Sequence, residues 1–242
     1  YTLLNEAILD DGQALYRAYS THRRATERAL RSVSPEELRQ AIQVLGGNPQ
    51  AATLDEAFTR KSVGTPLVHR PHHVVVILGE NYALWPLLPE YRDLGLAHTG
   101  QWLEAKGAHT YHFLSNGNGT MTSLNGFLTG LPDVGLYVNY MMGRHGDVDG
   151  LGIGAMMKRM GYKTVFWYGG LRSWQDIEHF TLREGFDELH CADELPNQGE
   201  SSSWGVPDGI LFDAIREQMQ KDTGDTFYFI LTTSNHPPFA YD

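Results

Sequence analysis

The sequence has little cysteine, few basic residues and no long apolar run, and each of these shortages excludes something. Cys191 is the single cysteine in 242 residues, so no internal disulfide can form. Cysteine usage therefore does not distinguish an oxidising from a reducing compartment. The longest apolar run, Val74 to Leu78, is far shorter than the roughly 18 residues of a membrane span. Nineteen Lys and Arg against 29 Asp and Glu give a net charge of −10, which argues against nucleic acid as a partner.

The two ends of the sequence suggest a part of a longer protein. The sequence begins with Tyr1 rather than Met, and no signal peptide is visible there. Its last residues follow directly on an apolar, strand-like run. We therefore expect a fragment cut at both ends. Its 41% hydrophobic content is enough to bury the core of one large domain, or of one domain with an appendage.

Residues 1–71 are predicted to form a helical, juxtamembrane-type segment followed by a linker. Ser34-Pro35-Glu36-Glu37 is a capping box with proline at the first helical position, and this helix should stop at Gly46-Gly47. A second short helix should begin at Thr53-Leu54. Before both, residues 11–31 predict a polar helix whose thin apolar stripe needs support from another part of the protein.

From residue 72 the pattern changes to alternating strands and helices. Continuous apolar strands are typical of parallel sheets that are buried on both faces. We predict strands at 73–78, 110–114, 164–168 and 226–232, and helices at 99–106, 122–129, 151–160, 173–184 and 208–220. Residues 72–242 are therefore predicted to form an α/β domain with a mostly parallel sheet flanked by helices.

Three polar clusters follow predicted strands, where ligands bind in such sheets. They contain Glu80, Thr120 and His236. Each has a simpler explanation: Glu80 as a solvated loop acid, Thr120 as a helix cap, and His236 as a histidine held by turn chemistry. The coincidence of three clusters at one edge favours a shared site.

The second cluster has the pattern of an anion site that contains a nucleophile. Gly117 and Gly119 let the backbone turn sharply and come close to a ligand. A helix that begins near Met121 would direct its free N–H groups and its positive dipole end at the Thr120 hydroxyl. Phosphoryl transfer requires this combination.

These motifs resemble those of the lipoteichoic acid synthase family, sulfatase-like members of the alkaline phosphatase superfamily. The resemblance extends over residues 73–242. It is carried, in order, by segments 75–81, 119–124, 128–132, 161–164, 169–170 with Trp174, 185–187, 204–205 with Asp208, and 233–239.

The resemblance implies a role for each candidate residue. Glu80 would be a metal ligand, and Thr120 would be both nucleophile and metal ligand. Trp174 and His236 would contact the substrate head group. A divalent cation (Mn, Mg or Zn) between Glu80 and Thr120 would lower the pKa of the hydroxyl and neutralise phosphate charge.

The sequence departs from the family pattern at several positions. It contains no Gly-Asp-His motif, because Gly146-Asp147 is followed by valine, so the C-terminal part of the domain and half of the metal site are expected to be missing. The family arginine near Trp174 is not matched, and Arg172 is our candidate to replace it as a substrate contact. Sulfatase chemistry is not expected, since Cys191 lacks the context for conversion to formylglycine.

From this resemblance we predict a metal-dependent phosphoglycerol transferase. Thr120 would attack a phospholipid such as phosphatidylglycerol, release diacylglycerol, and pass the glycerol phosphate to a polymer or glycan. The parent protein would sit at the extracytoplasmic face of a bacterial membrane, anchored by missing N-terminal helices. The alternatives are phosphoethanolamine transfer and a non-catalytic, sulfatase-like binding module.

Overall fold

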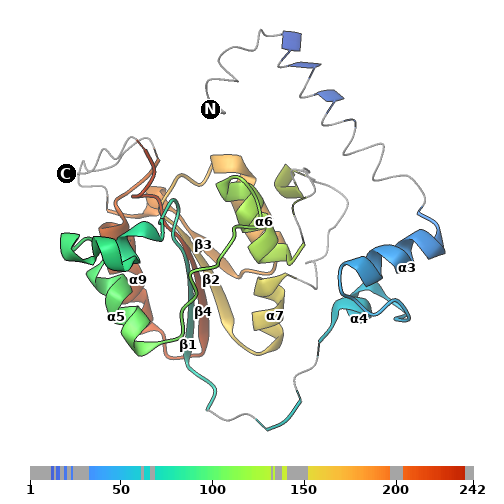
Figure 1. Cartoon of the computed structure of the whole chain (residues 1–242), viewed down its shortest axis with the longest axis horizontal. Helices are drawn as coiled ribbons and strands as arrows, with labels where there is room; N and C mark the ends of the chain where they lie inside the picture. The colour runs from blue at the N-terminus through green and yellow to red at the C-terminus, as the bar shows by residue number, and fades with distance from the viewer. Residues whose placement is uncertain are drawn as a thin grey trace. The chain divides into compact units, whose positions relative to one another are not determined.

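The computed structural model describes two compact units, which are treated separately here. The first lies within Tyr1–Leu67, and the second covers Val68–Asp133 and Tyr137–Asp242. Within them the described residues are 12–13, 15–16, 19–20, 23, 33–60, 63–65, 69–131, 133, 138–140, 152–196 and 204–237. Figure 1 shows both units along the chain.

The first unit contains the two short helices that the capping patterns predict. Helix α3 (Pro35–Val44) begins after Ser34, whose side chain accepts from the Glu37 amide while the Glu37 carboxylate accepts from the Ser34 amide. Helix α4 (Leu54–Phe58) begins after Thr53, whose hydroxyl accepts from the Glu56 amide at 3.2 Å. The helix predicted over 11–31 falls largely outside the described residues.

The second unit is built on a parallel four-stranded sheet, as predicted. The strands are β1 (His73–Leu78), β2 (Lys163–Tyr168), β3 (Glu188–His190) and β4 (Thr226–Leu231), in the order β1-β4-β2-β3. Every neighbouring pair is parallel. The carboxyl ends of β1, β4 and β2 therefore meet at one edge of the sheet.

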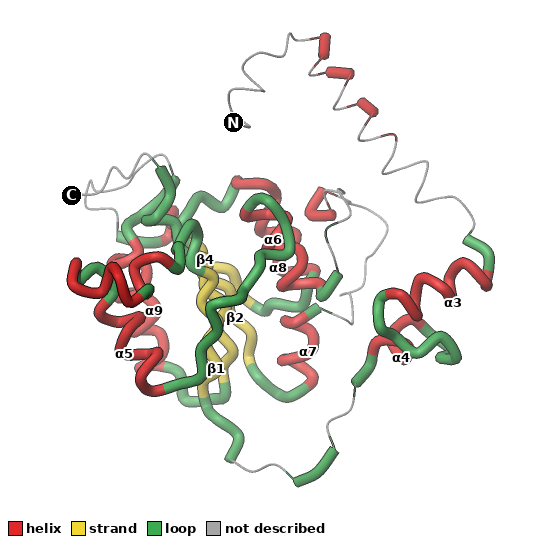
Figure 2. The backbone as a smooth tube through the Cα atoms, in the orientation of Figure 1, coloured by secondary structure: helices red, strands yellow, loops and turns green. Residues whose placement is uncertain are grey.

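Helices cover both faces of this sheet (Figures 1 and 2). One face packs Phe166 and Phe229 against helices α6, α7 and α8, and the other packs Tyr228 and Ile230 against α9. The helices are α5 (His98–Lys106), α6 (Thr120–Thr129), α7 (Ile153–Arg159), α8 (Ile177–Arg183) and α9 (Asp208–Lys221). Short 3₁₀ turns are η1 (Trp85–Leu87), η2 (Pro89–Leu94), η3 (Val138–Tyr140), η4 (Trp174–Asp176) and η5 (Ala192–Glu194).

One predicted strand was wrong, and one strand was not predicted. Residues 110–114 are irregular rather than a strand, and Phe113 and Leu114 are 66% and 92% exposed, so the sheet does not bury them. The three-residue strand β3 was missed, because it is too short to show a periodic pattern. Among the described residues, no helix is long and apolar enough to cross a membrane.

Candidate active site

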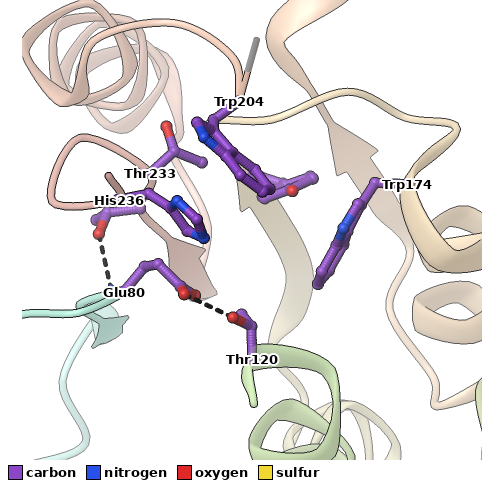
Figure 3. Close-up of a pocket in the computed structure, with 8 residues that line it drawn as sticks. Glu80, Thr120, Trp174, Trp204, Thr233 and His236 are labelled. Carbon is purple, nitrogen blue, oxygen red and sulfur yellow. Dashed lines mark hydrogen bonds between the residues drawn. The ribbon is translucent and has the colours of Figure 1, made fainter. Parts of the chain in front are cut away.

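A pocket opens where the carboxyl ends of β1, β4 and β2 meet. It is lined by Glu80, Thr120, Tyr168, Trp174, Trp204, Thr232, Thr233 and His236. Three of these positions follow or end a strand: Glu80 comes after β1, Thr232 after β4, and Tyr168 ends β2. The lining thus combines a carboxylate, hydroxyl groups and aromatic rings from segments far apart in the sequence (Figure 3).

Glu80 and Thr120 face each other across the floor of the pocket. The Thr120 hydroxyl donates to Glu80 Oε1 at 2.6 Å, which is the short distance typical of a bond to a charged acceptor. The backbone amide of Glu80 donates to the Thr232 hydroxyl at 3.2 Å, which ties β1 to the loop after β4. The predicted convergence of Glu80, Thr120 and His236 in one cleft is thus observed.

Thr120 is the first residue of α6, and the turn before it holds the helix end in place. The Thr122 hydroxyl accepts from the Gly119 amide at 3.2 Å and donates to the Gly119 carbonyl at 3.0 Å. Gly117 provides space, since a Cβ there would lie 2.2 Å from Thr122 Oγ1. The Thr120 side chain is therefore presented at a helix N-terminus, where the dipole favours negative charge.

The loop after β4 is fixed to the start of α9. Asp208 Oδ1 accepts from the amides of Thr233 and Ser234 at 2.9 and 3.1 Å. In return the Ser234 hydroxyl accepts from the Asp208 amide at 2.7 Å. These reciprocal bonds give the loop that carries His236 a defined path.

His236 is held against Trp204. Their ring centroids are 3.6 Å apart, and Trp204 Nε1 donates to the Pro237 carbonyl at 2.9 Å. His236 Nδ1 lies 2.8 Å from the same carbonyl. Because a carbonyl oxygen only accepts, Nδ1 carries a proton, and Nε2 is the ring nitrogen left for a ligand.

Tyr168 and Trp174 form an aromatic wall. Their ring centroids are 5.4 Å apart, and Tyr168 is only 4% exposed. Burial raises the pKa of the Tyr168 hydroxyl, and the nearby Glu80 carboxylate adds to the effect. The phenol is therefore a neutral group in this pocket.

The structure places four of the five predicted site residues around the pocket and one elsewhere. Glu80, Thr120, Trp174 and His236 line it, and Arg172 does not. The Arg172 guanidinium pairs instead with Glu178 at 2.8 Å, with Asp193 at 3.3 Å, and with Glu194. The family arginine therefore has no counterpart in Arg172.

Sequence reasoning did not select Tyr168, Trp204, Thr232 or Thr233 as site residues. Thr232 and Thr233 belong to the same polar cluster as His236, and Tyr168 falls at the carboxyl end of a predicted strand, so position alone marks all three. Trp204 belongs to a matched motif, but nothing in the sequence brings it to His236. That contact depends on the loop anchored by Asp208.

Glu80 and Thr120 fit part of a metal site. Two hard oxygen atoms 2.6 Å apart are suitable ligands for Mg²⁺, Mn²⁺ or Zn²⁺. However, the part of the chain that the structure describes contains no group of three or more His, Cys, Asp or Glu side chains that could hold a metal ion. Glu80 and Thr120 would supply two ligands, and catalytic sites usually need at least three.

We expect this 242-residue chain to bind divalent metal weakly, with a Kd of about 1 mM or higher. Calorimetric titration with Mn²⁺, Mg²⁺ and Zn²⁺ measures it directly. Glu80→Ala should remove the residual binding, whereas Glu217→Ala, which changes an exposed carboxylate on α9, should not. Tight stoichiometric binding that disappears in Glu80→Ala would show that further ligands lie within this chain.

The parallel sheet, flanked by helices and with a pocket at its carboxyl edge, defines an α/β fold. A structure of a protein in the alkaline phosphatase superfamily from Vibrio parahaemolyticus shares this fold, with a TM-score of 0.69 and 20% identity over 87% of this chain. The chain covers 52% of that structure, about half its length. The sulfatase family model matches residues 72–242.

The chain therefore belongs to the sulfatase family. Two further structures are similar at lower scores. One is the lipoteichoic acid synthase LtaP from Listeria monocytogenes, with 20% identity, a TM-score of 0.46, and coverage of 55% of this chain and 33% of that one. The other is the C-terminal periplasmic domain of EcEptC from Escherichia coli in complex with Zn, with 15% identity, a TM-score of 0.41, and coverage of 71% and 46%. The match to the sulfatase family model confirms the sulfatase-like assignment made from the sequence.

Proposed function

We propose that this chain is part of a metal-dependent phosphoryl transferase in which Thr120 is the nucleophile. The observation that carries the proposal is the 2.6 Å bond between Thr120 Oγ1 and Glu80 at the start of α6. A hydroxyl needs activation before it can attack phosphorus. When bound by Glu80 and Thr120, a divalent cation would lower the hydroxyl pKa and offset phosphate charge.

The reaction that we propose has two transfers. Thr120 Oγ1 forms a bond to phosphorus of a phosphatidylglycerol-like lipid, and the bond from phosphorus to the diacylglycerol oxygen breaks. That oxygen keeps the electron pair and takes a proton, while the Thr120 proton is released to solvent. A hydroxyl of a glycan or polymer then attacks the same phosphorus and frees Thr120.

The aromatic residues would hold the head group. Trp174 lies beside Tyr168, and His236 Nε2 is available to accept a hydrogen bond from a glycerol hydroxyl. A membrane-anchored parent protein with its active site at the extracytoplasmic face is part of the same proposal, since both the lipid and the envelope polymer are found there.

Phosphoethanolamine transfer is the second candidate. One observation favours it: the described residues that line the pocket include Tyr168, Trp174 and Trp204 but no Lys or Arg. Aromatic faces attract ammonium groups, and the described part of the lining places no Lys or Arg beside them to repel one.

The test is to trap the intermediate. The full-length protein is incubated with Mn²⁺ and a fluorescent phosphatidylglycerol, and the peptide that contains Thr120 is analysed by mass spectrometry. We expect a glycerophosphoryl group on Thr120 together with released diacylglycerol. Phosphatidylethanolamine in a parallel incubation distinguishes the two head groups. A full-length protein that binds metal but never modifies Thr120 with either lipid would contradict the proposal.

A further inference from the structure

The Tyr168 hydroxyl has no role in the site as described so far. It ends strand β2, its ring is buried, and it lines the same pocket as Glu80 and Thr120. Within the described part of the chain, no group hydrogen-bonds to this hydroxyl. Because Tyr168 lines the pocket, a ligand that enters it can accept a hydrogen bond from this hydroxyl.

The position of this hydroxyl is well defined. Strand β2 lies inside the sheet between β3 and β4, so its last residue has little freedom. The ring packs in the same core cluster as Phe166 and Phe229. Gly170 makes room for the hydroxyl end, because a Cβ there would lie 2.3 Å from Tyr168 Oη. A group held this rigidly can stabilise charge without reorganising.

The pocket needs such a donor. Among the described residues, its lining contains no Lys or Arg, so a neutral donor such as a phenol is the kind of group these residues offer to phosphoryl oxygens that face away from a metal. A phenol is protonated at neutral pH and can donate a hydrogen bond. A hydrogen bond to an oxygen becomes stronger as negative charge develops on it.

We propose that Tyr168 is a catalytic residue whose hydroxyl donates a hydrogen bond to a non-bridging oxygen of the phosphoryl group that Thr120 attacks. The proposal rests on the proposed function of the same site. No proton is transferred from Tyr168. The phenol lowers the energy of the transition state while the bond to Thr120 forms and the bond to the leaving alcohol breaks.

Two matched variants of the full-length protein test this role. Tyr168→Phe removes the hydroxyl and keeps the ring. Tyr162→Phe is the control, because the Tyr162 hydroxyl donates to the Pro71 carbonyl at 2.8 Å, beside the opposite end of β2. Gly170→Ala is a third variant, which should displace the hydroxyl end of Tyr168. Each is assayed with Mn²⁺ for binding of inorganic phosphate by calorimetry and for turnover of bis(4-nitrophenyl) phosphate.

We expect Tyr168→Phe to lower kcat by about 10- to 100-fold with little change in KM, and to weaken phosphate binding several-fold. Gly170→Ala should also lower kcat and weaken phosphate binding. Tyr162→Phe should change neither kcat nor phosphate binding. Wild-type phosphate affinity and turnover in Tyr168→Phe would overturn the proposal, as would a wild-type protein that binds no phosphate. If phosphate binding depends on Tyr168 but Thr120 never becomes modified, the contact stands and the proposed transferase function fails.

Discussion

Replacing Thr120 with alanine should abolish turnover of a phosphodiester by the full-length protein while leaving it folded. The loss should reach about three orders of magnitude or more, because a covalent route has no alternative once its nucleophile is removed. The helix should survive, since the capping bonds at Gly119 come from Thr122 rather than from Thr120. Steady-state kinetics and circular dichroism measure the two parts of this expectation.

Neighbouring hydroxyls of α6 provide the controls. Thr122→Ala removes a helix cap and should cost roughly 1 kcal/mol of stability, but most of the activity should remain. Ser123→Ala should also remain active, because the Ser123 hydroxyl donates to the Gly117 carbonyl at 3.1 Å and does not line the pocket. A Thr120→Ala variant with more than about a tenth of the wild-type rate, roughly 1.4 kcal/mol of barrier, would remove Thr120 as nucleophile.

Gly205→Ala should be among the most destabilising small substitutions in this chain. Gly205 has a φ of +142°, and a Cβ there would lie 1.9 Å from the Gly169 carbonyl oxygen. The next residue, Val206, donates its amide to that same carbonyl at 2.9 Å, so the backbone cannot move away without losing this bond. We expect a loss of about 3 kcal/mol or more in the free energy of unfolding, measured by urea denaturation.

Gly209→Ala is the matched control. Gly209 lies in α9, and an added Cβ would meet nothing within 4 Å. Alanine in a helix is more favourable than glycine by about 1 kcal/mol, so this variant should be as stable as the wild type or slightly more stable. If the two substitutions changed the free energy of unfolding equally, the steric conflict between a Cβ at position 205 and the Gly169 carbonyl would not be the cause of the loss.

The sequence predicted the framework of the site because that framework depends on local patterns. Continuous apolar runs located β1, β2 and β4, and the rule that ligands bind at the carboxyl ends of strands selected Glu80, Thr120 and His236. Their convergence needs only a parallel sheet. The roles of these residues as ligand, nucleophile and substrate contact remain predictions.

What the sequence could not provide depends on contacts between distant segments. The β-favouring residues of 110–114 predicted a strand, but Phe113 and Leu114 are exposed, which shows that tertiary context overrides propensity. The sequence suggested Arg172 as a substrate contact, but the acidic side chains that pair with its guanidinium come from segments that the sequence does not show to be close. The contact between Trp204 and His236 joins two segments about 30 residues apart, and no local pattern encodes it.

The strand order has a consequence for how the protein folds. Among the described strands, β1 pairs only with β4, which lies about 150 residues further along the chain, so closing this loop costs substantial entropy before any contact compensates. During synthesis we expect β1 to lack its partner β4 until residues 226–231 have emerged, and so to be exposed to aggregation. Strands β2 and β3, which are much closer in sequence, can pair first. The pocket is therefore completed late, when β4 inserts between β1 and β2 and brings their carboxyl ends together.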